Sequence, residues 1–209
     1  MPADGQPSLK ELARAERADL AAFLAELQLE QWHRPSLCAG WTVKDVVAHV
    51  VSYDELGVGG LVKRFARGRV VHANQVGVDD FAGLSPGELL AYLNRHLHPT
   101  GLPAGFGGMI GFVDATVHHQ DIRRALNCPR VIPADRLVRV LPLIPGNPRL
   151  GAGRRIRGLG LRATDVDWSH GHGVEVTGPG EALMMAMTGR PAALTDLDGP
   201  GKSTLAQRL

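Results

Sequence analysis

The stretch Trp41-Thr-Val-Lys-Asp-Val-Val-Ala-His-Val-Val-Ser-Tyr53 carries a full set of signals for an amphipathic helix. The Thr42 hydroxyl can cap the helix, and Asp45, at the third position, can reach back to the cap and close a capping box. The apolar positions then recur at helical spacing, at Val43, Val46, Val47, Val50 and Tyr53. We therefore predict a helix over residues 42–56, ended by the glycines at positions 57, 59 and 60.

Helical signals continue on both sides of this stretch. Ser8 and Glu11 form a second potential capping box ahead of an apolar pattern, and Ser85 precedes a proline at the first position of another helix. The same criteria predict long helices over residues 8–27, 85–97 and 109–126 and shorter ones over residues 61–67 and 133–141. These helices predict a helical bundle over residues 1–145.

The pattern of apolar residues changes after the prolines and the glycine that end this helical region. Apolar residues alternate over residues 158–168, which is typical of a strand, and a turn at 169–173 leads to a second short strand over 174–177. A buried helix over 179–187 and a last helix over 203–209 follow. The predicted fold is mainly α, with a helical bundle followed by a small α/β (α+β) domain over residues 146–209.

Composition excludes several classes of protein. The chain has 209 residues, a formal net charge of +2 and 44% hydrophobic residues, as a soluble globular protein does. It has no apolar run long enough to span a membrane and no signal-peptide pattern, so we expect a cytoplasmic protein. The balanced charge argues against a nucleic-acid partner. Arginines cluster over residues 149–162, either as an exposed linker or as a clamp for a carboxylate or phosphate.

The two cysteines, Cys38 and Cys128, match no metal-binding spacing. Without a secretory context, we expect no disulfide between them. Cys38 lies just ahead of a predicted helix, where a thiol can become acidic, but we interpret it as a buried or inert thiol.

The candidate chemistry lies on the predicted helix over residues 109–126. Asp114 and His118 are four residues apart, so they project from one face about 40° apart and can share a divalent ion. The alternative is a hydrogen-bonded pair within the helix. Asp121, one turn further, is either another ligand or an acceptor that orients an imidazole. His119 points about 100° away from His118, and we place it on the flank of the helix.

His49 is the candidate third ligand, because helical bundles build metal sites from inward side chains on facing helices. The alternative is a hydrogen-bonded histidine at the margin of the core. His170 and His172 lie in the glycine-rich segment Ser169-His-Gly-His-Gly173, where we expect a turn.

These segments resemble a known family. Cys38-Ala-Gly-Trp-Thr-Val-Lys-Asp-Val-Val-Ala-His49 resembles the CPGWTVRDLLAH signature of the mycothiol-dependent maleylpyruvate isomerase family, whose N-terminal domain is a DinB-like four-helix bundle. Asp114-Ala-Thr-Val-His-His-Gln-Asp-Ile-Arg-Arg-Ala125 resembles its second motif, and residues 163–173 and 178–183 resemble its C-terminal domain. The resemblance covers nearly the whole chain.

The resemblance implies a divalent metal, usually zinc with nickel as the alternative, held by His49, Asp114 and His118. The best-studied members of the family have Glu where this chain has Asp114, and the shorter side chain must sit closer to the metal or bind it with different geometry. The resemblance also implies mycothiol as a thiol cosubstrate, so the expected partners are a low-molecular-weight thiol and a small-molecule substrate.

Our leading hypothesis is therefore a mycothiol-dependent isomerase or transferase. Three protein ligands leave a metal position open, where a bound thiol would lose its proton and attack an electrophilic carbon of the substrate. Arg190 and Arg154 are candidates for binding carboxylates of substrate or cosubstrate. Metal-assisted hydrolysis is a second enzymatic option. The rival is a non-catalytic metal- or ligand-binding stress or regulatory protein, in which a fourth protein ligand closes the site.

Overall fold

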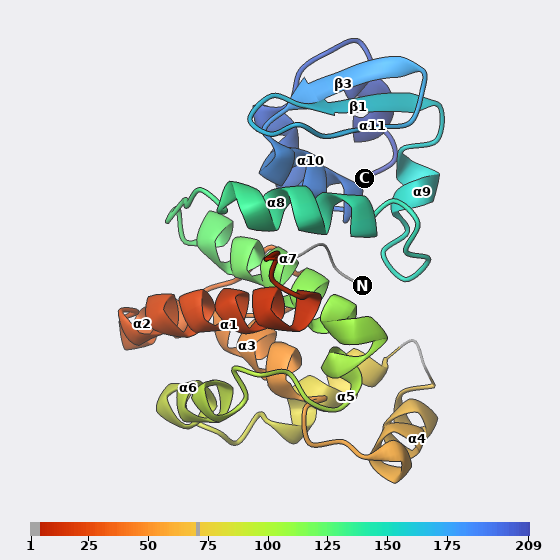
Figure 1. The fold of residues 1–209 in the computed structure, drawn as a ribbon. Coiled ribbons are helices and arrows are strands. Elements are labelled where there is room, and N and C mark those ends of the chain that lie inside the picture. The colour runs from red at the N-terminus through yellow and green to blue at the C-terminus, as the bar shows by residue number, and fades with distance from the viewer. Residues whose placement is uncertain (1–4, 70–71) are drawn as a thin grey trace. The chain divides into compact units, whose positions relative to one another are not determined.

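The computed structural model describes residues 5–69 and 72–209. They divide into two compact units, Met1–Pro129 and Arg130–Leu209, which we describe separately (Figure 1). The predicted fold class, mainly helical with a small sheet, is confirmed. None of the described helices has both the length and the apolar content that crossing a bilayer requires.

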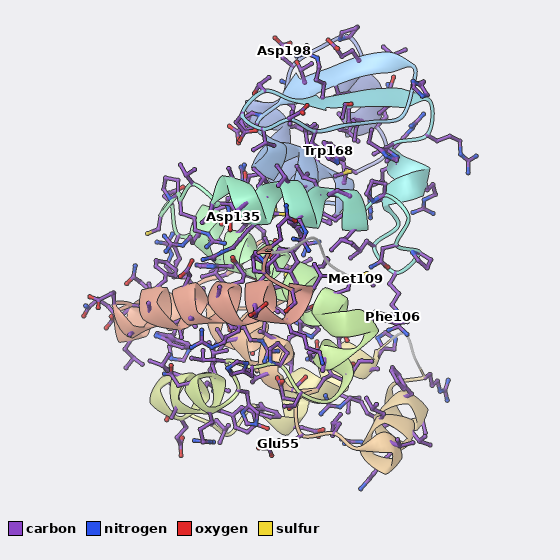
Figure 2. The ribbon with its side chains drawn as sticks, in the orientation of Figure 1. Glu55, Phe106, Met109, Asp135, Trp168 and Asp198 are labelled. Atoms are coloured by element: carbon purple, nitrogen blue, oxygen red, sulfur yellow. The ribbon has the colours of Figure 1, made fainter. Side chains whose placement is uncertain are left out.

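The first unit is built from helices. They are α1 (Leu9–Ala25), α2 (Leu29–Trp32), α3 (Val43–Val51), α4 (Val58–Gly68), α5 (Ala73–Asp80), α6 (Pro86–Arg95) and α7 (Met109–Ala125), with 3-10 turns η1 (Leu102–Ala104) and η2 (Phe106–Gly108) before α7. Figure 2 labels Phe106, the first residue of η2, and Met109, the first residue of α7.

Both predicted capping boxes are present, with Ser8 and Glu11 at the start of α1 and Thr42 and Asp45 at the start of α3. Helix α6 begins at the predicted proline and has a third capping box, formed by Ser85 and Glu88, which was not predicted. Helix α3 ends earlier than predicted, at Val51, because the backbone and hydroxyl of Ser52 both donate to the His49 carbonyl and close the helix. The prediction that the glycines at positions 57, 59 and 60 end this helix is wrong, since Gly57 is the N-cap of α4 and the other two lie within α4.

Helix α3 lies at the centre of the core of the first unit. Its buried valines pack with side chains of α1, α6 and α7 in one cluster, which includes Leu20, Leu24, Val43, Val46, Val47, Val50, Val51, Leu89, Leu93 and Ile122. Helices α1 and α7 pack closely, and at Gly108 (φ +95°) an added Cβ would lie 2.8 Å from the backbone nitrogen of Lys10. The core thus fixes α3 against α7, which carry the residues of interest.

The second unit combines short helices with a three-stranded sheet. Its elements are α8 (Ala134–Val140), η3 (Leu141–Leu143), α9 (Ala152–Arg155), β1 (Leu159–Ala163), β2 (Ser169–His170), β3 (Val174–Gly178), α10 (Gly180–Met187), η4 (Pro191–Asp196) and α11 (Lys202–Ala206). The strand order is β2-β1-β3, with β1 antiparallel to β2 and parallel to β3. Leu161 pairs with His170 on one side and Val176 on the other. The buried helix α10 packs against β1 and β3.

Several boundaries differ from the sequence-based ones. The unit boundary lies after Pro129 rather than after residue 145, because α8 packs within the second unit, where Leu137 and Leu141 lie against Gly180. The first strand ends at Ala163, before the predicted 168, and β2 forms inside the predicted turn. A short helix, α9, occupies part of the region that was interpreted as a linker or a clamp.

Candidate metal centre

Helices α3 and α7 bring the three predicted ligands together. The Nε2 atom of His49 lies 3.3 Å from Oδ1 of Asp114, and the Nε2 atom of His118 lies 3.5 Å from the same oxygen. One nitrogen or oxygen atom from each residue lies within 4.8 Å of the others. Residues separated by 65 positions, His49 and Asp114, therefore present their polar atoms to one point.

The donor set fits a divalent metal. Two imidazole nitrogens and one carboxylate oxygen are the ligand types of catalytic zinc sites, with bonds of about 2.0–2.2 Å. Ligand atoms on such a tetrahedron are roughly 3.3–3.6 Å apart, by geometry from those bond lengths. The distances of 3.3 and 3.5 Å from Asp114 to the two imidazoles fall in that range. The aspartate is thus long enough to share an ion with both histidines in this backbone arrangement.

His49 is held by the last turn of α3 and by aromatic neighbours. Its ring lies 5.1 Å from the Trp41 ring and 6.3 Å from the Tyr53 ring, centroid to centroid. The Nδ1 atom of His49 is buried and has no hydrogen-bond partner among the described residues. Aromatic packing and the contact of Nε2 with Oδ1 of Asp114, at 3.3 Å, therefore orient this imidazole, whereas no hydrogen bond holds its Nδ1 side.

Asp121 supports His118 from the other side of the ring. Nδ1 of His118 lies 2.9 Å from Oδ2 of Asp121, whose side chain is fully buried. A carboxylate in this position accepts the Nδ1–H and leaves the Nε2 lone pair free to bind a metal. Of the two roles considered for Asp121, the geometry favours the acceptor that orients an imidazole.

Cys38 also belongs to this cluster, which the sequence-based interpretation of an inert thiol missed. Its Sγ lies 3.1 Å from Oδ2 of Asp121 and 3.5 Å from Nδ1 of His118. Cys38 belongs to the same sequence motif as His49, and this proximity along the chain was the only signal in the sequence that could have placed the thiol near the site.

The two histidines and the aspartate perturb each other's protonation. Burial raises the pKa of the Asp114 carboxyl, but the nearby His49 and His118 lower it more, so its pKa lies well below the usual range. Burial lowers the pKa of His118, while Asp114, Asp121 and Cys38 raise it, with a net pKa well above the usual value. Asp114 and His118 thus each favour the charged form of the other.

His119 does not lie on the flank of α7 as predicted, because it is fully buried. Its Nδ1 lies 3.0 Å from Oε1 of Glu16 on α1, and the Nε–H of Arg123 donates to its Nε2 at 2.8 Å. The Arg123 guanidinium in turn lies over the Phe23 ring. His119 therefore serves the contact between α1 and α7 and is not part of the candidate metal centre.

In the second unit, the predicted arginines gather near α9 and the end of α10. Burial lowers the pKa of Arg155, and the neighbouring charges of Arg154 and Arg190 lower it further, so the three guanidiniums lie near one another. Arg155 donates to the carbonyl oxygens of Leu150 and Met187. Arg162 instead pairs with Glu175 across the sheet. The basic cluster is thus divided between structural contacts and candidate anion-binding side chains.

Comparisons with known proteins agree with this description. Residues 13–98 match the family model of the mycothiol maleylpyruvate isomerase N-terminal domain. The fold is similar to the crystal structure of a mycothiol-dependent maleylpyruvate isomerase, at 15% identity and a TM-score of 0.59, over 93% of this chain and 92% of that one. A histidine-to-alanine mutant of that type gives 16% identity with the same TM-score and coverage. No curated protein sequence matches significantly. Residues 13–98 are thus similar to the N-terminal domain of the mycothiol maleylpyruvate isomerases, and the chain as a whole has the fold of the solved maleylpyruvate isomerase structures.

Proposed function

We propose that the chain is a metal- and mycothiol-dependent enzyme that isomerises a small electrophilic substrate, as maleylpyruvate isomerase does. The observation that carries the proposal is the convergence of His49, Asp114 and His118 on one point. The family match of residues 13–98 supports mycothiol as the thiol.

The three residues would hold a divalent ion, with zinc the first candidate and nickel the second, through Nε2 of each histidine and a carboxylate oxygen of Asp114. When bound, such an ion lowers the pKa of a neighbouring thiol and so supplies a thiolate at neutral pH. His118 must release its proton before its Nε2 can act as a ligand, and its Nδ1–H stays with Asp121.

The positions of neighbouring residues support an open site. Asp121 lies on the Nδ1 side of His118, and His119 is engaged with Glu16, so neither supplies a fourth ligand. Asp114 is the most accessible of the three, with 28% of its side chain exposed against 7% for His49 and 12% for His118. Solvent thus reaches the carboxylate of the site more readily than its two imidazoles.

The proposed reaction balances without a further reagent. Addition of the thiolate sulfur to one carbon of a maleyl double bond would move the π electron pair onto the adjacent carbonyl as an enolate and leave a single bond, about which the substrate rotates. Return of that electron pair would expel the same thiolate and restore the double bond in the trans geometry. We propose that Arg190 and Arg154 bind carboxylates of the substrate or of the thiol, because guanidinium pairs such groups in a bidentate manner.

The test is an assay of zinc-loaded protein with maleylpyruvate, in the presence of mycothiol, of glutathione, or of no thiol. We expect isomerisation that requires mycothiol and is lost in His49→Ala, with Asp114→Glu as the conservative control that keeps a carboxylate ligand. Protein that binds zinc yet gives no thiol-dependent turnover would favour the non-catalytic metal- or ligand-binding module.

A further inference from the structure

The thiol of Cys38, the carboxylate of Asp121 and the imidazole of His118 form a continuous hydrogen-bonded chain. The Cys38 S–H donates to Oδ2 of Asp121 at 3.1 Å, and the same oxygen lies 2.9 Å from Nδ1 of His118. One carboxylate oxygen therefore accepts from both groups.

The loop before α3 is attached to α7 at this place by more than one contact. The Leu37 backbone N–H donates to the carbonyl of Asp121 at 3.3 Å. The Cys38 backbone N–H donates to Oγ of Ser36 at 3.1 Å, and the Ser36 hydroxyl donates to the Trp41 carbonyl at 2.8 Å. The loop thus has a defined conformation that presents the Cys38 side chain to the buried carboxylate.

The two imidazoles of the site differ in their support. His118 has a carboxylate behind its Nδ1, whereas the buried Nδ1 of His49 has no hydrogen-bond partner among the described residues. Hydrogen-bonded carboxylates behind metal-binding histidines fix the tautomer and the ring orientation. The placement of Nε2 of His118 toward Asp114 therefore depends on Asp121, and Asp121 is held in turn by Cys38.

We infer that Cys38 is a positioning residue of the metal centre, which acts through Asp121 on His118 and does not bind the metal itself. The inference rests on the proposed metal site. Sγ, Nδ1 and Oδ2 of the three residues also lie close enough to hold an ion. Metal bound there would displace the His118 Nδ1–H that Asp121 accepts, so the hydrogen-bonded arrangement and a thiolate ligand are alternatives that experiment can separate.

The experiment measures Co²⁺ and Zn²⁺ affinity by competition with a chelator, together with the absorption spectrum of the Co²⁺ form. The variants are Cys38→Ala, Cys38→Ser and Asp121→Ala, with Cys128→Ala as the matched control at the other cysteine. We expect Asp121→Ala to weaken metal binding about 10–100-fold, as loss of such acceptors does. Cys38→Ala should weaken it by a smaller factor of about 3–10. Cys38→Ser, which keeps a donor, should stay close to the wild type, and so should Cys128→Ala.

A second readout covers the case in which Asp121→Ala folds poorly. Nitrogen NMR of the histidine side chains in the metal-free protein, at a pH at which His118 is neutral, should show its proton on Nδ1 in the wild type and in Cys38→Ser, and a mixed population in Cys38→Ala. Wild-type affinity, spectrum and tautomer in Cys38→Ala would overturn the inference. So would a sulfur-to-cobalt charge-transfer band in the near ultraviolet that Cys38→Ala removes, since it would make the thiol a direct ligand. Metal binding without isomerase activity would refute the proposed reaction but leave this inference intact, whereas failure of the wild type to bind metal would refute both.

Discussion

Replacement of Arg17 by methionine should strongly destabilise the first unit, because this side chain connects three helices from a fully buried position. Its Nη1 donates to Oδ1 of Asp54 at 2.9 Å and to the His96 carbonyl at 2.7 Å, and its Nη2 donates to the Val50 carbonyl at 2.9 Å. Both charged side chains are 0% exposed. Val50 is the neighbour of His49 on α3, so the contacts of Arg17 also support the metal centre.

The size of the effect follows from the burial of the pair. Methionine fills much of the volume of the arginine stem but leaves the Asp54 carboxylate buried without its counter-charge. Breaking a buried ion pair in this way costs about 3–5 kcal/mol. At about 2–4 °C per kcal/mol for a chain of this length, the melting temperature should fall by roughly 6–20 °C.

The loss should depend on pH in a defined direction. Burial raises the pKa of Asp54, and Arg17 partly opposes that rise, so its pKa in the variant lies higher still. A carboxyl whose pKa is raised by folding contributes stability below its unfolded pKa of about 3.9 and loses that contribution as pH rises through its folded pKa. Arg17→Met should therefore be less destabilised at pH 5 than at pH 8, by the direction of this shift.

Urea unfolding followed by far-ultraviolet circular dichroism at both pH values measures the effect. The double variant Arg17→Met/Asp54→Asn is the control, and it should recover part of the loss because no buried charge is left. Its amide oxygen can still accept from the Thr100 N–H, which Asp54 now accepts at 2.8 Å. A loss below about 1 kcal/mol at pH 8, or an equal loss at both pH values, would refute the reasoning.

Three further predictions concern the metal, the backbone and the arginines. Zinc affinity should increase from about pH 5 to pH 8. The raised pKa of His118 means that zinc must displace a proton from this imidazole, and this displacement becomes easier as the pH rises. A zinc affinity that does not change with pH in chelator competition would contradict this. Gly101→Ala should lower the free energy of unfolding by more than about 2 kcal/mol, because at φ +55° the added Cβ would meet a backbone carbonyl oxygen. Gly107→Ala is the control: its φ is +70° but its Cβ would lie in open space, so the loss should be only about 1 kcal/mol. Equal losses in thermal unfolding of the two variants would argue against this contact. Arg190→Gln should raise the KM for substrate or thiol while the zinc content stays unchanged. Arg162→Gln is the control and should leave the KM unchanged. An unaltered KM in Arg190→Gln would exclude the proposed role of Arg190.

Local signals explain which elements could be predicted. Ser8 and Thr42 each start a helix where the capping box places it, because a capping box satisfies backbone donors within a few residues. Helix α6 starts where the proline after Ser85 places it. Helix α5 was not predicted, since its sequence has only a weak apolar pattern and its place depends on packing against α3 and α4. The short α2 and α9 likewise carry too few residues for a periodic pattern.

Some contacts of the candidate site could likewise be predicted from the sequence, and others could not. The spacing of Asp114 and His118 on one helix could be read from the sequence, because neighbours on a helix follow from its period. The contact of Cys38 with Asp121 joins positions 83 residues apart, and only the packing of the loop before α3 onto α7 creates it. The burial of His119 also depends on a partner, Glu16, from a helix about 100 positions earlier in the chain.

The central claim is that His49, Asp114 and His118 form a metal site, and elemental analysis tests it most directly. The protein is purified without chelator and without a histidine tag, next to His49→Ala, His118→Ala and, as a control, His172→Ala at an exposed position of the second unit. We predict about one zinc or nickel ion per chain in the wild type and in His172→Ala, and none in the other two variants. A wild type that carries no metal and takes up none from added zinc would contradict the claim, as would unchanged metal content in both His49→Ala and His118→Ala.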